Sequence, residues 1–224
     1  MMWKTVANLL EAMDGKTPTV QTKMICSAFE NYKDSENYHQ MGMFWKILAL
    51  DFESNDIAEK KAIKWMEDIF GIHEEEMETA VYVHDDLGEA VYYLDTGAES
   101  KGITLASVNG HLGLKCGNRD NFEIISDAIY KMDAIERKWF IRYWLRKPRN
   151  GISRGNVLKF VAKYYGKKVS NVKKDANHNA IYALANSLSQ CWQKKHLRAN
   201  GLESILWITN TMETVIKSTK VDLM

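Results

Sequence analysis

The stretch IERKWFIRYWLRKPRNGIS (residues 135–153) contains the body of one helix, a turn and the start of a second helix. Pro148 has no N–H and disfavours a helical conformation in the residue before it, so the first helix should end near Arg146. Gly151 permits a positive φ, and Ser153 can cap the N-terminus of the next helix. The stretch therefore predicts two helices joined by a sharp turn.

The same turn predicts a site for phosphate. A helix that begins at Arg154 would present free backbone N–H groups at its N-terminus, where the helix dipole also favours anions. Four basic side chains flank this N-terminus, namely Arg146, Lys147, Arg149 and Arg154. The alternative is an ordinary turn with solvated charges. We expect the turn to contact phosphate.

The rest of the chain is also typical of helices. Only two prolines occur in 224 residues, which favours long helices over a loop-rich β-sandwich. Apolar residues recur at helical spacing along most of the chain. Residues 96–117 hold five glycines and resemble a linker between two halves. The expected helices cover residues 3–13, 43–50, 57–70, 74–80, 87–94, 121–131, 134–145 and 154–165, with one more starting at Pro18.

The two halves of the chain resemble each other at a shift of 95 residues. Residues 44–50 (FWKILAL) parallel residues 139–145 (WFIRYWL), and Phe70-Gly71 parallels Tyr165-Gly166. We expect an all-α, multi-helix domain with an internal pseudo-twofold repeat, which would present two equivalent turns on one side. That arrangement suits the local symmetry of a duplex backbone. The repeats are expected to span about 43–95 and 138–185.

The charges are unevenly distributed, although the formal net charge is only +1. Residues 51–99 hold 15 acidic residues and three lysines, whereas residues 137–174 hold 13 basic residues and no acidic one. Solvated helical surfaces usually mix the two signs. We infer that the basic segment binds a polyanion such as nucleic acid. The alternative is that the acidic and basic segments neutralise each other, within the fold or between subunits.

Composition argues against several classes of protein. A hydrophobic share of 46% and a charged share of 26% are typical of a folded protein and not of a disordered one. The longest apolar runs are too short for a membrane span, and the N-terminus lacks the layout of a signal peptide. Three widely spaced cysteines form neither a disulfide framework nor a zinc motif. We expect an intracellular setting: the cytoplasm, the nucleoid or, for a viral protein, the host cytoplasm.

The stretch 135–153 resembles a segment of the N-terminal DNA-binding domain of ATP-dependent DNA ligases. That family has a helical Arg followed by a short basic turn that ends in Arg-x-Gly and an aliphatic residue, here residues 149–152 (RNGI). Residues 70–76 (FGIHEEE) look like the family's glycine turn, and residues 85–91 (DDLGEAV) look like its Asp-Leu-Gly helix start. The resemblance extends over residues 3–188.

This resemblance implies sequence-independent binding of duplex or nicked DNA, along the minor groove, in replication, repair and recombination. Contacts would go to sugar and phosphate, through helix N-termini and basic turns. In the first half, Asp56 and Glu59 depart from a basic turn. The expected DNA contacts are Arg142, Arg146, Lys147, Arg149, Asn150, Gly151, Ser153, Arg154, Asn156 and Lys159, together with Asn55, Lys60 and Lys61 in the first half.

The chemistry of ligation is not expected in this chain. Covalent nucleotidyl transfer needs a Lys in a Lys-x-Asp-Gly context and carboxylates for a metal ion. A near match, residues 131–134 (KMDA), has Ala in place of Gly, and we interpret it as a coincidence. We therefore expect no catalytic residue, metal or cofactor here. ATP and Mg²⁺ are implied for a catalytic partner chain. Residues 1–193 would form the DNA-binding domain, and residues 194–224 a helical tail available to that partner.

Three alternatives remain at this point. The chain could be a standalone nick-binding regulatory protein, or an all-helical protein–protein adaptor whose basic segment binds an acidic partner. It could also be a helix-turn-helix regulator that places residues 152–165 in a major groove. A steep salt dependence of DNA binding would distinguish DNA binding from the adaptor, and a sequence preference would indicate the regulator.

Overall fold

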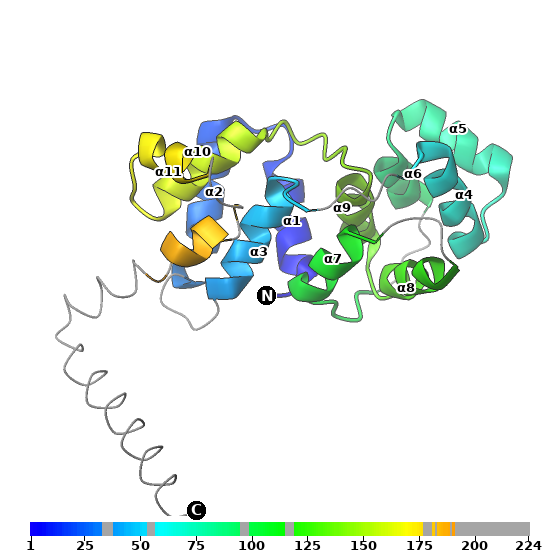
Figure 1. Ribbon diagram of the computed structural model, residues 1–224. Coiled ribbons are helices and arrows are strands. Elements are labelled where there is room, and N and C mark those ends of the chain that lie inside the picture. Colours follow the sequence, from blue (N-terminus) through cyan, green and yellow to red (C-terminus); the bar gives the residue numbers. More distant parts are fainter. Residues whose placement is uncertain are drawn as a thin grey trace, which may run out of the picture.

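The computed structural model describes residues 1–32, 38–52, 57–94, 99–114, 119–176, 181, 183–188 and 190, and these residues form an all-α domain (Figure 1). None of the helices in these ranges is long and apolar enough for a membrane span. The helices are α1 (Trp3–Met13), α2 (Pro18–Ala28), the 3₁₀ helix η1 (Glu30–Tyr32), α3 (Tyr38–Leu48), α4 (Glu59–Phe70), α5 (Glu74–His84), α6 (Leu87–Leu94), α7 (Leu105–Leu112), α8 (Arg119–Tyr130), α9 (Ala134–Trp144), α10 (Arg154–Tyr164) and α11 (Val169–Ala176).

The helix boundaries follow the repeat expected from the sequence. The first residues of α4 and α10 are 95 residues apart, and so are the first residues of α5 and α11. Gly71 and Gly166, also 95 residues apart, both have φ near 63° after α4 and α10. Leu50 and Arg146 have positive φ values in the equivalent turns after α3 and α9. The local structure of one half is therefore repeated in the other.

The two halves are interlocked. The first helix of the second half, α9, packs against α6 of the first half, and α3 of the first half packs against α10 of the second. Figure 1 shows α9 beside the α4–α6 lobe. The tryptophans Trp3, Trp45, Trp139 and Trp144 are completely buried in this shared core. Because helices of each half pack against helices of the other, the buried residues of both halves form one shared core.

The contact between α6 and α9 is unusually close at Gly88. A Cβ atom on Gly88 would lie 2.6 Å from the backbone oxygen of Lys138 and 2.9 Å from Cγ of Arg142. Only a residue without a side chain fits there. Asp86 accepts a hydrogen bond from the N–H of Glu89 at the start of α6. The Asp-Leu-Gly element of the sequence is thus a helix start fitted against α9.

The predicted cap Ser153 is present, but the predicted linker is wrong. Ser153 accepts a hydrogen bond from the N–H of Asn156, and Asp133 forms a capping box with Glu136. Within residues 96–117, however, the chain forms α7, which Thr104 caps and which packs against α3, α8 and α9. Residues 194–224, expected to be a helical tail, lie outside the described residues.

Candidate nucleic-acid interface

The turn between α9 and α10 has an unusual backbone. Arg146, Arg149 and Gly151 all have positive φ values, of 57°, 53° and 67°. Positive φ is uncommon for residues other than glycine, so two arginines in this conformation must be stabilised by the surrounding structure. The turn ends at the N-cap Ser153, where α10 begins. The sequence predicted the sharp turn and the cap, but not the left-handed arginines.

Asn150 holds this turn from the inside. Its Nδ2 donates to the hydroxyl of Tyr143 at 3.0 Å, and its Oδ1 accepts from the N–H of Ile152 at 3.0 Å. Nε2 of Gln21, on α2, donates to the backbone oxygen of Asn150 at 3.2 Å. Complete burial raises the pKa of the Tyr143 hydroxyl, which keeps this partner protonated. Asn150 therefore fixes the shape of the turn, and its side chain does not face solvent.

The N-terminus of α10 is open to a ligand. Arg154 and Gly155, its first two residues, are exposed, and their backbone N–H groups donate to no acceptor in the described part of the chain. Gly151 is also exposed, and nothing lies within 4 Å of where its Cβ would be. The helix dipole favours an anion at this place. The arrangement is the one that the sequence predicted for a phosphate site.

Three basic side chains around this N-terminus are exposed, and each one pairs with a carboxylate from the acidic segment. The side chains of Lys147, Arg149 and Arg154 are 50%, 38% and 49% exposed. The two charged segments thus neutralise each other in part within the fold, which was the alternative to a polyanion partner. The pairs are Lys147 Nζ–Glu59 Oε2 at 2.7 Å, Arg149 Nη1–Asp85 Oδ2 at 3.0 Å and Arg154 Nη1–Asp51 Oδ1 at 3.2 Å.

The two equivalent turns also contact each other directly. Arg146 extends its guanidinium across to the turn after α3, where Nη2 and Nη1 donate to the backbone oxygens of Leu50 and Phe52, both at 2.9 Å. The guanidinium also lies 5.0 Å from the centre of the Phe52 ring. The side chain of Arg146 is therefore used to join the halves.

Comparison with known proteins identifies the family of this domain. The family model described as DNA ligase N terminus matches residues 2–162. The chain belongs to this family. No curated protein matches the chain significantly. The matched part of the ligase N-terminal domain includes the whole α9–α10 turn, but it stops short of Leu188, where the resemblance in the sequence was expected to end.

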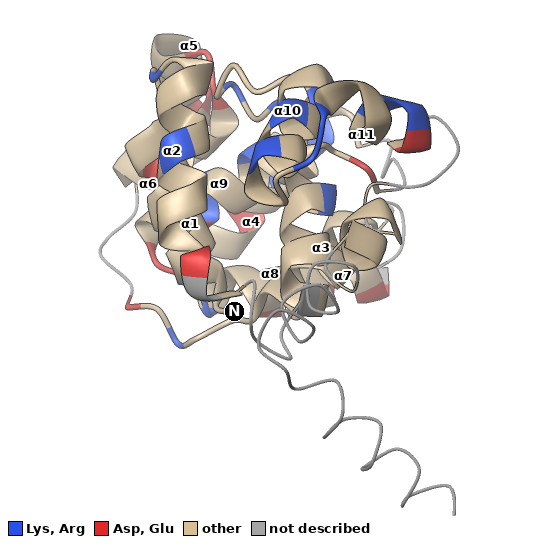
Figure 2. Cartoon of the chain, turned by 90° about the vertical axis from the view of Figure 1, so that its left-hand side faces the viewer, with Lys and Arg blue, Asp and Glu red and all other residues tan. Residues whose placement is uncertain are grey.

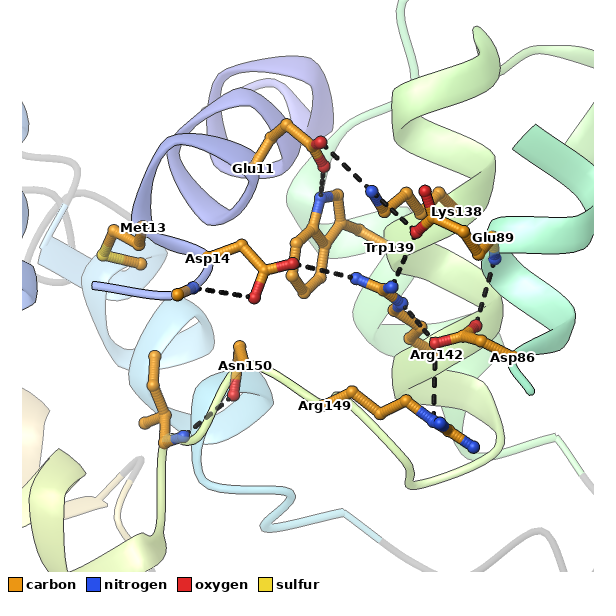
Figure 3. Close-up of polar contacts among 12 residues, drawn as sticks. Glu11, Met13, Asp14, Asp86, Glu89, Lys138, Trp139, Arg142, Arg149 and Asn150 are labelled. Carbon is orange, nitrogen blue, oxygen red and sulfur yellow. Dashed lines mark hydrogen bonds and ion pairs between the residues drawn. The ribbon is translucent and has the colours of Figure 1, made fainter. Parts of the chain in front are cut away.

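Arg142 does not lie on the surface of the ligase N-terminal domain, contrary to the sequence prediction. Its side chain is only 7% exposed, because α9 is buried between α1 and α6. Its Nε lies 2.9 Å from Oδ2 of Asp86, and its Nη2 lies 2.7 Å from Oε2 of Glu89 (Figure 3). A DNA contact through Arg142 is therefore at odds with the fold.

A chain of charges continues from Arg142 in both directions (Figure 3). On one side, Asp86 also lies 3.4 Å from Nε of Arg149, in the turn. On the other side, Nζ of Lys138 lies 2.8 Å from Glu89 and 3.1 Å from Glu11. Burial alone would lower the pKa of Lys138, but the hydrogen bonds to Glu89 and Glu11 outweigh it and raise that pKa. The basic run of the sequence is thus partly an internal network.

The other predicted contacts fall into different places. Lys60 and Lys61 are exposed in the first turn of α4, whereas Asn55 lies outside the described residues. Asn156 is half-buried, and Lys159 is exposed on α10. Neutralisation between the two charged segments was an alternative in the sequence analysis, but the individual partners Asp51, Glu59 and Asp85 could not be predicted, since pairing across about 60 to 100 residues leaves no local pattern.

The string at residues 131–134 is part of a helix junction. Lys131 pairs with Asp127 one turn earlier on α8, and Asp133 caps α9. Across the described ranges, no group of three or more His, Cys, Asp or Glu side chains is placed to hold a metal ion. The acidic residues Glu74, Glu75 and Glu76 occupy the first turn of α5, where the helix dipole stabilises them.

Proposed function

We propose that this ligase N-terminal domain binds duplex DNA without sequence preference, through phosphate and sugar contacts along the minor groove. The observation that carries this proposal is the α9–α10 turn. Lys147, Arg149 and Arg154 surround the free N–H groups at the start of α10, and the turn is held rigidly from below. Contacts of this kind position a protein on a duplex and carry no sequence information.

The first half contributes to the same interface. The ion pair between Lys147 and Glu59 brings the start of α4 to the edge of the α9–α10 turn. Lys60 and Lys61 are exposed in that first turn of α4. A duplex seated on the start of α10 would therefore meet a second helix N-terminus with cations of its own. This supports a contact across two stretches of backbone.

We further propose that the domain holds nicked DNA while a nucleotidyltransferase unit outside residues 1–224 joins the strands with ATP and Mg²⁺. Family membership supports this role, and the 224 residues contain no Lys-x-Asp-Gly string. The contribution of this chain would be proximity and orientation of the DNA ends. The setting would be intracellular DNA replication, repair or recombination.

Fluorescence anisotropy with matched nicked, intact and single-stranded DNA, across a salt series, tests the proposal. We expect binding to duplexes of unrelated sequence with equal affinity, and a linear fall of log affinity with log salt concentration. Tighter binding to the nicked duplex would support the role in ligation. Absence of binding to all three DNAs at low salt would overturn the proposal and favour the protein–protein adaptor.

A further inference from the structure

The outward face of α10 and the segment after it carry four exposed lysines, Lys159, Lys163, Lys167 and Lys168, which we call the lysine surface. Figure 2 shows Lys and Arg gathered over α10 and the segment that leads into α11. Among the described residues, no carboxylate lies within ion-pair distance of any of the four. The lysine surface thus differs from the α9–α10 turn, where each exposed cation has a carboxylate partner.

The backbone holds these lysines together. Lys159 and Lys163 are one turn apart on α10, so their side chains are neighbours. Gly166, with φ of 63°, reverses the chain, and the N–H of Lys167 donates to the backbone oxygen of Ala162 at 2.8 Å. The helix dipole explains a cation in the last turn of α10, but it does not explain Lys159 in mid-helix. Like charges at neighbouring positions repel each other, and a bound anion would relieve that repulsion.

We propose that the lysine surface binds the phosphate backbone of the duplex beyond the part held by the α9–α10 turn. This inference rests on the proposed function. Helix α10 connects the lysine surface to the turn, because it begins at the turn with Arg154 and ends at Tyr164, next to Lys163. Lys163, Lys167 and Lys168 lie beyond residues 2–162, which the family model matches.

The length of α10 sets the reach of the extension. Eleven residues at about 1.5 Å each span roughly 16 Å. B-DNA advances about 34 Å in ten base pairs, so a duplex that runs along α10 would cover this distance in roughly five base pairs. A duplex just long enough for the turn would not reach the lysine surface, and one longer by about five base pairs would.

The test compares wild type with the variant Lys163→Ala/Lys167→Ala/Lys168→Ala on a series of duplexes of increasing length. A matched control, Lys4→Ala/Lys101→Ala/Lys131→Ala, removes the same charge from three exposed lysines on α1, before α7 and after α8. Circular dichroism checks that both variants are folded. We expect the lysine-surface variant to match wild type on the shortest duplex that binds. On longer duplexes its salt slope should fall by about 2 to 3, at about 0.9 for each lost contact.

If wild type binds DNA and the lysine-surface variant has the same salt slope as wild type at every duplex length, the inference is overturned and the proposed function stays intact. An equal loss of salt slope at all duplex lengths would also overturn it, because the effect would then not depend on the reach of α10. An equal loss of salt slope in the control variant would overturn it too, because the effect would then not be specific to the lysine surface. Failure of wild type to bind any duplex would overturn the proposed function and this inference together.

Discussion

Lys147 and Asp51 hold equivalent places in the two halves of the domain, and each pairs with the first residue of a helix in the other half, α4 or α10. Lys147 follows the turn after α9 and pairs with Glu59 of α4, whereas Asp51 follows the turn after α3 and pairs with Arg154 of α10. The geometry is repeated with the charges reversed. In these two pairs the cations come from the second half, so we expect DNA contact to be stronger there.

Removal of a competing carboxylate should strengthen DNA binding. Asp85 is 91% exposed, at φ of 49°, and pairs with Arg149. Asparagine tolerates this backbone conformation, so Asp85→Asn should remove the charge and keep the turn. An exposed ion pair is worth at most about 1 kcal/mol, so we expect affinity to rise by about two- to fivefold in anisotropy titrations. Glu78→Gln, an exposed change on α5, the helix that Asp85 follows, is the matched control. An equal rise in both variants would contradict a specific role for Asp85.

Arg142 should matter for stability and not for DNA binding. Arg142→Ala leaves the buried carboxylate of Asp86 with Arg149 alone and Glu89 with Lys138 alone. Breaking one partner of a buried pair costs roughly 3 to 5 kcal/mol, and we expect the lower end because these cations remain. Urea unfolding measures the loss. A fall in the salt slope of DNA binding without loss of stability would contradict this prediction and indicate that Arg142 contacts DNA.

Gly88 should be intolerant of any side chain. Gly88→Ala would force its Cβ against the backbone oxygen of Lys138, and we expect a loss of about 1 to 3 kcal/mol in the free energy of unfolding. Gly110→Ala on α7 is the matched control, because nothing lies within 4 Å of the added atom. That change should stabilise the domain by roughly 0.5 to 1 kcal/mol. Similar effects of the two changes on stability would show that the close approach of α6 and α9 does not exclude a side chain at position 88.

Alkaline pH should destabilise the domain through Tyr143. Burial raises the pKa of its hydroxyl above the ordinary value of 10.0, so the unfolded chain loses the proton first as the pH rises. The contribution of Tyr143 to stability is therefore complete below about pH 10 and falls above it. Unfolding free energies measured at intervals from about pH 8 to 11 should fall more steeply for wild type than for Tyr143→Phe. Parallel pH profiles would mean that Tyr143 ionises equally in both states.

Local features of the fold could be predicted from the sequence because their causes are local. Ser153 and Asp133 cap helices through hydrogen bonds to residues three positions away, and Gly71 and Gly166 end helices through their own φ values. The repeat was visible because helix spacing and turn residues recur together. Helix α7 was missed, since the glycines around it suggested a linker. The cap Thr104 and the spacing of Leu105, Val108 and Leu112 were the available signal.

The partners of the charges could not be predicted, because they depend on how the helices pack. Arg142 and Arg149 belong to one basic run in the sequence, yet one is buried among carboxylates and the other lies on the surface. Their surroundings differ because α6 packs against α9 and brings Asp86 and Glu89, which are 56 and 53 residues away in the sequence, to Arg142. A count of charges therefore predicts an interface in the α9–α10 region, which stays a prediction, but it overstates the number of exposed cations there.

The most direct measurement is the salt dependence of DNA binding for wild type and for Lys147→Ala/Arg149→Ala/Arg154→Ala, on two duplexes of unrelated sequence. If the α9–α10 turn holds the sugar–phosphate backbone, the triple variant should lose about 3 in salt slope, equally on both duplexes. An unchanged slope on both duplexes, or a loss confined to one of them, would contradict the account.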